Sequence, residues 1–107
     1  MESTQYNISI ENQNFSVFKL FPDDLSLTNS AKLKDVIDNQ IKSGIKNIGI
    51  DLSDVVAVNS SGLGILIGLL NKVKSENGNF KLINPKERLI DVFKITKLNL
   101  VFEVYFS

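Results

Sequence analysis

The sequence predicts an α/β fold, a mainly parallel central sheet with packed helices, in the order β-β-α-β-α-β-α-β. Short runs rich in Ile, Val and Phe alternate with longer segments whose apolar residues recur every three or four positions. Repeated strand–helix–strand units of this kind join parallel neighbours in a sheet. The chain has 107 residues and a hydrophobic fraction of 43 %, which suffices for one modest core, so we expect a single domain over residues 1–107.

The beginning of the chain predicts a β-hairpin. Tyr6, Ile8 and Ile10 alternate with polar residues and so share one face of a first strand. Residues 15–19 continue the alternation on a second strand. The segment 11–14 between them contains two asparagines, which favour a turn.

A helix and a buried strand follow the hairpin. The recurrence of Leu33 and Ile37 belongs to an amphipathic helix over residues 29–43. Gly44 occupies the position that commonly ends a helix. Residues 47–53 form a short, largely apolar run, which is typical of a strand buried on both faces.

The second half of the chain repeats this alternation. A loop over residues 54–59 leads into a predicted helix over residues 60–75. A turn at residues 77–78 precedes the next strand. We then expect a short helix over residues 87–96 and a last strand over residues 101–106.

Composition excludes several classes of function. Twelve basic residues balance twelve acidic ones, so the chain lacks the basic character that nucleic-acid binding requires. It has no cysteine and no histidine, which removes Ser-His-Asp and Cys-His catalysis and histidine-ligated zinc. Any enzyme would have to work with carboxylates, lysines and hydroxyls. The acidic pairs Asp23–Asp24 and Asp51/Asp54 have no further ligand nearby in the sequence, and we expect no enzyme, no metal site and no cofactor. The sequence shows neither a secretory signal nor an apolar stretch long enough for membrane insertion, so we expect a cytoplasmic protein.

The segment AVNSSGLGILIG, residues 57–68, carries the candidate site. It connects the predicted strand at residues 47–53 to the next helix, and function in open α/β sheets gathers at such carboxyl ends of strands. Asn59 and Ser60 are residues that cap helix N-termini. A serine here is exposed and can carry a phosphate at the electropositive end of the helix. Two interpretations remain open: a simple cap, or a modification site at Ser60 with Ser61 in reserve.

The helix after this segment has apolar residues on more than one face. One face suffices to dock it on the sheet, and it is formed by Leu63, Leu66, Ile67, Leu70 and Val73. Ile65 and Leu69 fall elsewhere, beside two glycines spaced four residues apart. Either neighbouring helices or a partner protein cover this second face, and we favour a partner. The predicted contact region comprises Asn59, Ser60, Ser61, Gly62, Leu63, Gly64, Ile65, Leu69 and Lys72.

The stretch DLSDVVAVNSSGLGILIGLLNKVK resembles the signature of the STAS domain, specifically of the bacterial anti-sigma factor antagonists. In that family a buried strand leads through a loop to Asp-Ser-Ser/Thr-Gly-Leu-Gly and a helix. The later stretch GNFKLINPKERLIDVFKITKLNLVF fits as well, so the resemblance extends over nearly the whole chain and implies a STAS-like fold.

The resemblance also implies a mechanism in transcription regulation. In the family, the unmodified domain binds an anti-sigma factor that is also a serine kinase, and the sigma factor is released. The kinase binds ATP and phosphorylates the first serine of the motif, which is Ser60 here. The complex then separates, and a phosphatase resets the cycle.

The chain departs from the family pattern near this serine. Asn59 replaces the acid before the serine, and Ser26 replaces a second acid in a Gly-x-Leu-Asp segment, whose glycine is Asp23 here. Asp23 and Asp24 are candidates to replace these acids in space. Family members often carry another helix after the last strand, which this chain does not continue into. We therefore expect a barer sheet edge that is open to self-association.

A second interpretation keeps the STAS-like fold and drops the phosphorylation. The chain would then be a STAS subunit that docks on a transporter, such as a lipid-transport ATPase, or a scaffold in a signalling complex. The helix that begins at Ser60 would be a fixed contact in such an assembly.

Overall fold

A computed structural model describes residues 4–21, 25 and 29–107. These residues form a five-stranded sheet whose spatial order follows the chain. The strands are β1 (Thr4–Ile10), β2 (Gln13–Lys19), β3 (Asn47–Asp51), β4 (Asn79–Ile83) and β5 (Glu103–Tyr105). Strand β1 pairs antiparallel with β2, and the other three neighbouring pairs are parallel. The predicted fold class and order of elements are confirmed.

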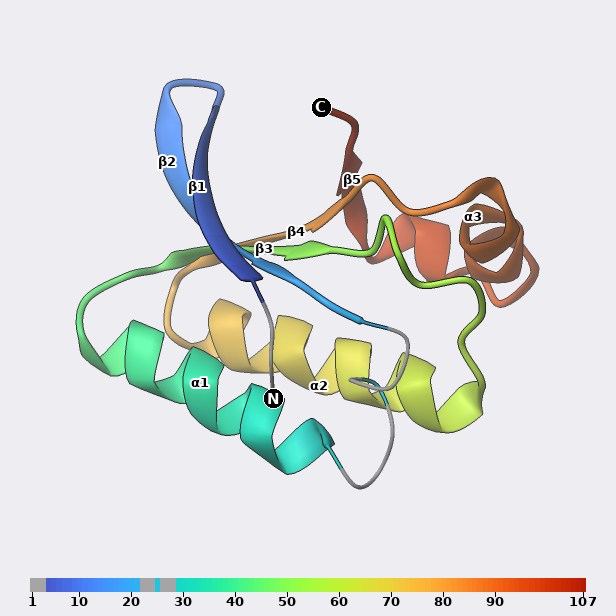
Figure 1. The fold of residues 1–107 in the computed structure, drawn as a ribbon, viewed down its shortest axis with the longest axis horizontal. Coiled ribbons are helices and arrows are strands. Elements are labelled where there is room, and N and C mark those ends of the chain that lie inside the picture. The colour runs from blue at the N-terminus through green and yellow to red at the C-terminus, as the bar shows by residue number, and fades with distance from the viewer. Residues whose placement is uncertain (1–3, 22–24, 26–28) are drawn as a thin grey trace.

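The two long helices, α1 (Ser30–Lys42) and α2 (Ser60–Ser75), lie side by side on one face of the sheet (Figure 1). Each connects one parallel strand to the next, and both connections step along the sheet in the same direction. Because such crossovers are right-handed, they place both helices on the same face. Both helices also begin at the same edge of the sheet (Figure 1).

The main core lies between this face and the helices. Strand residues such as Ile48, Ile50 and Leu82 are fully buried against Leu33 of α1 and Leu66 of α2. The amphipathic patterns thus identify Leu33 and Leu66 correctly as core residues, but they miss Leu69 of α2, which is also buried. The cluster contributes most of the burial that stabilises the domain, because burial of each such side chain is worth about 1.5–3 kcal/mol.

The first helix ends as its sequence predicts. Gly44 adopts a φ of 101°, which glycine reaches without the steric cost that a Cβ imposes. The amide of Ile45 then donates to the Gln40 carbonyl at 3.1 Å, as in the common glycine-ended cap.

The hairpin turn is shorter than expected. Only Glu11 and Asn12 form it, with φ values of 53° and 66°, while Gln13 already pairs with Ile10. The prediction of a turn over residues 11–14 was therefore too long. Two-residue turns with positive φ match the twist of the strands they join, and this accounts for the shorter connection.

The opposite face of the sheet has its own small core. Ile10, Phe15, Val17 and Ile83 are buried there, with partly buried tyrosines around them. Gly49 lies at the centre, where a Cβ would approach Val17 Cγ2 to 3.0 Å. Side chains of the strands therefore seal this face by themselves.

The C-terminal part forms α3 (Glu87–Ile95), a 3₁₀ turn η1 (Leu98–Leu100) and β5. The rings of Phe93 and Phe102 pack against each other with their centroids 5.4 Å apart, and both residues belong to the main core. The predicted strand over residues 101–106 is shorter, because only residues 103–105 pair with β4. Ile95 and Leu100 are more than four-fifths exposed here.

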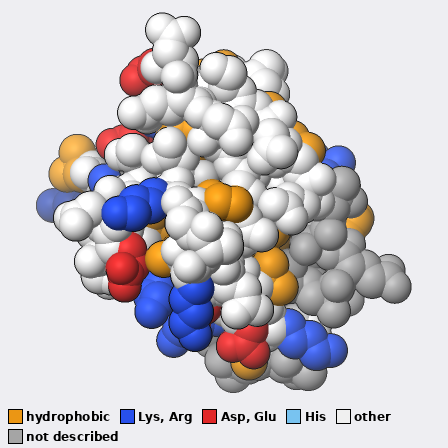
Figure 2. Space-filling view, turned by 90° about the vertical axis from the view of Figure 1, so that its left-hand side faces the viewer, with side chains coloured by type: hydrophobic (Ala, Val, Ile, Leu, Met, Phe, Trp, Pro, Cys, Tyr) orange, Lys and Arg blue, Asp and Glu red, His pale blue; other side chains and the backbone are white. Residues whose placement is uncertain are grey.

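On the face away from α3, Figure 2 shows basic side chains beside a few acidic side chains and only scattered hydrophobic side chains.

We expect Gly78→Ala to destabilise the fold. Gly78 lies between α2 and β4, where a Cβ would overlap the Lys46 carbonyl oxygen and lie 2.8 Å from Val73 Cγ1. Overpacking of this kind costs about 1–3 kcal/mol. Urea denaturation measures the loss, and Gly64→Ala is the matched control because a Cβ there meets no atom within 4 Å. Equal midpoints for the two variants would contradict the prediction.

Candidate functional site

The candidate site lies where β3 leads into α2. Asp51 is the last residue of β3, and Ser60 is the first residue of α2. The segment between them crosses from the carboxyl end of the strand to the start of the helix. This is the position at which open α/β sheets place their functional groups.

Asn59 caps α2. Its side-chain Oδ1 accepts a hydrogen bond from the Gly62 amide at 2.8 Å, and its backbone is extended. Gly62 is needed for this tight entry, because a Cβ there would lie 2.6 Å from Val58 Cγ1. The predicted cap at Asn59 is confirmed, and Asn59 alone performs it. Ser60, which the sequence offers as a second capping residue, stands one position inside the helix.

Ser60 and Ser61 are both exposed. The Ser60 hydroxyl forms no hydrogen bond with any described residue, and neither does that of Ser61. The first turn of α2 contains no acidic residue, so a negative group at this helix end meets no like charge on its own turn. The helix N-terminus itself favours such a group.

The structure divides the predicted contact residues into three groups. Asn59, Ser60, Ser61 and Gly64 are exposed, Leu63, Ile65 and Lys72 are partly exposed, and Gly62 and Leu69 are buried.

Two members of the predicted contact region need correction. Leu69 is only 3 % exposed and belongs to the main core, and Gly62 is buried beneath Val58. The helical wheel could not reveal that α1 packs along the flank of α2 that carries Leu69. The partial exposure of Lys72 has a related cause, since its Nζ lies 3.6 Å from the Asp38 carboxylate of α1.

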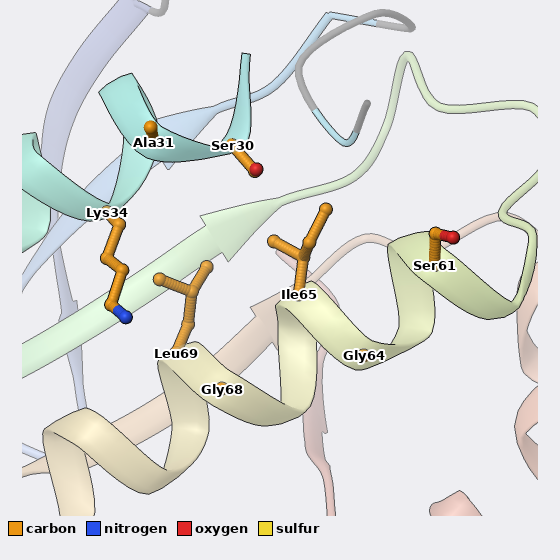
Figure 3. Close-up of a pocket in the computed structure, with 8 residues that line it drawn as sticks. All are labelled: Ser30, Ala31, Lys34, Ser61, Gly64, Ile65, Gly68 and Leu69. Atoms are coloured by element: carbon orange, nitrogen blue, oxygen red, sulfur yellow. The ribbon is translucent and has the colours of Figure 1, made fainter. Parts of the chain in front are cut away.

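A groove of about 450 Å³ separates the first halves of α1 and α2. Figure 3 shows the Lys34 side chain extending from α1 toward Leu69 of α2. Ile65 and Ser61 lie closer to the N-terminus of α2. The sequence predicts the α2 side of this groove through its two glycines. It does not predict the α1 side, because no pattern in the sequence identifies which helix lies beside α2. The lining residues are Ser30, Ala31, Lys34, Ser61, Gly64, Ile65, Gly68 and Leu69.

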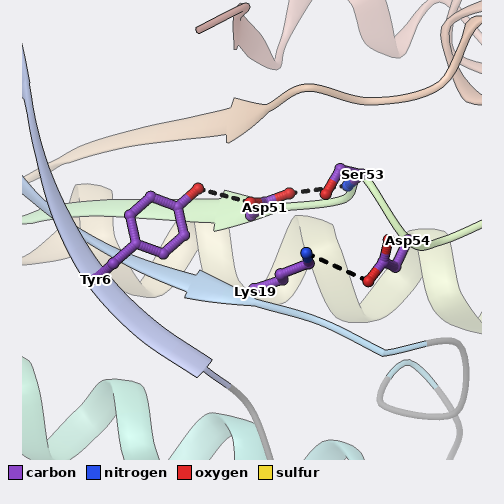
Figure 4. A network of polar contacts seen from close by, with 5 residues as sticks. All are labelled: Tyr6, Lys19, Asp51, Ser53 and Asp54. Carbon is purple, nitrogen blue, oxygen red and sulfur yellow. Dashed lines mark hydrogen bonds and ion pairs between the residues drawn. The ribbon is translucent and has the colours of Figure 1, made fainter.

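A polar network anchors the other end of the β3–α2 connection (Figure 4). The Tyr6 hydroxyl donates to Asp51 Oδ2 at 2.6 Å, and the Ser53 amide donates to Asp51 Oδ1 at 2.8 Å. Lys19 Nζ lies 3.3 Å from the Asp54 carboxylate. Strands β1 and β2 therefore both hold the first residues of the connection, through Tyr6 and Lys19.

The network keeps Asp51 ionised. Burial alone would raise the pKa of Asp51, but hydrogen bonds from Tyr6 and Ser53 and the charge of Lys19 together hold it below its usual value. Burial and the hydrogen bond to the Asp51 carboxylate raise the pKa of Tyr6. At neutral pH the pair is therefore a phenol donating to a carboxylate, which is a strong form of hydrogen bond.

Several sequence expectations lie outside the described residues. Asp23, Asp24 and Ser26 are among them, so their position relative to Ser60 stays a prediction. Within the described ranges, no three His, Cys, Asp or Glu side chains cluster as metal ligands would. No helix in the same ranges combines the length and apolarity that a membrane span requires.

Comparison with known sequences identifies a family. Residues 9–107 match the family model described as the STAS domain. A candidate anti-sigma factor antagonist of Thermotoga neapolitana is 36 % identical over 70 residues, which cover 65 % of this chain and 62 % of that protein. The anti-sigma-B factor antagonist of Bacillus subtilis is 40 % identical over 58 residues, 54 % of this chain and 53 % of that protein. The aligned region thus spans between about half and three fifths of these relatives.

Comparison of folds agrees. The phosphorylated form of the Bacillus cell fate determinant SpoIIAA superposes with a TM-score of 0.65 at 18 % sequence identity. The alignment covers 97 % of this chain and 91 % of that structure. At this identity the similarity establishes the fold alone.

We expect Asn59→Ala to cost about 1 kcal/mol of stability, because it leaves the Gly62 amide without its acceptor. Asn59→Asp keeps the acceptor and adds a negative charge at the helix N-terminus, so it should be neutral or stabilising by up to about 1 kcal/mol. Thermal denaturation of the three proteins measures both effects. An Asn59→Ala variant with the melting temperature of the wild type would contradict the capping role.

Tyr6→Phe should destabilise the protein by about 1.5 kcal/mol at neutral pH, since it removes a hydrogen bond to a charged group. The folded-state pKa of Asp51 is depressed, so this contribution is present above the ordinary carboxyl pKa of about 3.9 and is lost as pH falls through the lower folded value. Chemical denaturation should therefore show a smaller difference in the free energy of unfolding between Tyr6→Phe and wild type at about pH 3 than at neutral pH. Tyr105→Phe, on the same sheet face, is the control, and a gap independent of pH would refute the assignment.

Proposed function

Because the chain belongs to the STAS domain family, where it groups with the anti-sigma factor antagonists, we propose that it binds an anti-sigma factor that is also a serine kinase. In this proposal the exposed start of α2 is the docking surface. Phosphorylation of Ser60 by the bound kinase ends the complex, and a phosphatase restores it. The partner supplies the ATP and the catalytic groups, and this chain supplies the acceptor hydroxyl.

One observation carries the proposal: the Ser60 hydroxyl is not used by the fold. Asn59 accepts the capping hydrogen bond, so Ser60 is exposed at the helix start without a hydrogen bond to a described residue. A hydroxyl that caps a helix is engaged and costly to modify. Here a kinase can reach the hydroxyl, and its modification breaks no contact of the described fold.

Electrostatics at the helix start support a switch that acts on the partner. A phosphate adds about −1.5 to −2 charges at neutral pH. The first turn of α2 holds no acidic residue, and the helix end stabilises an anion, so the domain stays folded. The added charge instead meets whatever docks beside it. A hundredfold loss of affinity needs only about 2.7 kcal/mol, which like-charge repulsion or desolvation of the phosphate supplies.

The relatives support the same interpretation. The B. subtilis relative is named an anti-sigma-B factor antagonist, and the structural neighbour from Bacillus was solved in a phosphorylated form. Asn59 stands where the family has an acid, so the cap is kept while a negative charge beside the serine is absent.

We expect one phosphate to be added when the protein is incubated with ATP and the purified serine-kinase anti-sigma factor of the same organism. Mass spectrometry should show that Ser60→Ala abolishes this phosphate and that Ser61→Ala, the matched control, retains it. Ser60→Glu should weaken binding to the anti-sigma factor in calorimetry by about a hundredfold, the 2.7 kcal/mol given above.

Two results would refute the switch. Phosphorylation on Ser61 instead of Ser60 would show that Ser60 is not the acceptor. Tight binding without any phosphate, and without an effect of Ser60→Glu, would favour a fixed contact such as docking on a transporter subunit.

A further inference from the structure

Gly64 and Gly68 have no role in the packing of the described fold. A Cβ added at either position meets no atom within 4 Å, whereas a Cβ at Gly62 or Gly78 collides with its neighbours. Glycine inside a helix costs about 1 kcal/mol relative to alanine. The helix therefore bears this cost twice at positions where alanine fits, and the reason must lie outside the packing of the domain.

Both glycines line the groove between α1 and α2. Ala31, another small residue, lines it from the side of α1. Ile65 provides a partly exposed apolar side chain, whereas Leu69, although it borders the groove, is almost entirely buried in the core (Figure 3). Small residues on facing walls keep the groove open. They also allow the backbone of a docked element to approach α2 closely.

Among the described residues that line the groove, one charged side chain has no ion-pair partner in the described part of the chain. Lys34 lines it and forms no ion pair with a described residue, while Lys19, Lys72 and Lys81 are each paired with a carboxylate. A ligand that fits this groove therefore combines an apolar surface with an acidic group. This charge complementarity narrows the class of partner.

We propose that the groove receives an amphipathic helix of the anti-sigma factor, with its small apolar face on Gly64 and Gly68 and a carboxylate beside Lys34. The inference rests on the proposed function and adds the recognition element to it. Two parallel helices with an open groove between them suit a third helix, which is a recurrent mode of peptide recognition. A small molecule instead favours a pocket that encloses most of its surface.

A helix bound in this groove also explains how Ser60 can control binding. Ser61 lines the groove, and Ser60 precedes it on the first turn of α2. A phosphate on Ser60 therefore adds negative charge one residue from the groove lining and repels an acidic helix bound there. The modification acts on the bound element directly, without a change of fold.

The test compares matched variants for affinity to the purified serine-kinase anti-sigma factor by calorimetry. Gly68→Leu fills the groove and should weaken binding by about tenfold or more, while denaturation shows equal or higher stability because leucine is the better helix former. Asn71→Leu adds the same side chain at an exposed position of α2 outside the groove and should bind as wild type. Lys34→Glu should weaken binding by about tenfold as well, with Lys32→Glu on the same helix as the unaffected control.

The outcomes separate the two proposals. If wild type binds the anti-sigma factor and both groove variants bind equally well, the groove inference is wrong and the proposed function stands. If wild type does not bind at all, both are wrong. Light scattering that shows a dimer dissociated by Gly68→Leu, or native mass spectrometry that shows a small amphiphile lost in that variant, would assign the groove to another occupant and overturn the inference.

Discussion

The handedness of the strand–helix–strand connection determines the functional architecture of this domain. Because β2, β3 and β4 follow one another across the sheet, right-handed crossovers leave α1 and α2 parallel on one face. Their N-termini then share one edge, and the groove between them is lined by Ser61 in the first turn of α2 (Figures 1 and 3). This topology brings the start of α2, the groove and Lys34 close together, although α1 and α2 are separate in the chain.

Within this arrangement, neighbouring residues have separate tasks. Asp51, held by Tyr6 and the Ser53 amide, fixes the end of β3. The Asn59 side chain accepts the hydrogen bond of the Gly62 amide at the start of α2. Ser60, placed between these anchors and the groove, is left without a structural task in the described fold. The connection is therefore held at both ends, while the Ser60 hydroxyl that follows it stays exposed.

The sequence predicted the fold and the cap well because both depend on local patterns. Alternation identified the strands, the three-to-four spacing identified Leu33 and Leu66 as core residues, and Gly44 marked the end of α1. The misplacement of Leu69 has a different origin. Its burial depends on how close α1 packs, a distance that no periodicity encodes. The Tyr6–Asp51 hydrogen bond was invisible for the same reason, since 45 positions separate its partners.

The separation of cap from acceptor has a consequence for the lifetime of the protein. If Ser60 held the helix start, each round of modification would loosen α2 and expose the domain to proteases. With Asn59 in that role, the proposed modification of Ser60 would leave the helix cap and the folding equilibrium unchanged. In the proposed cycle, the same folded molecule would then serve through many rounds of phosphorylation and dephosphorylation.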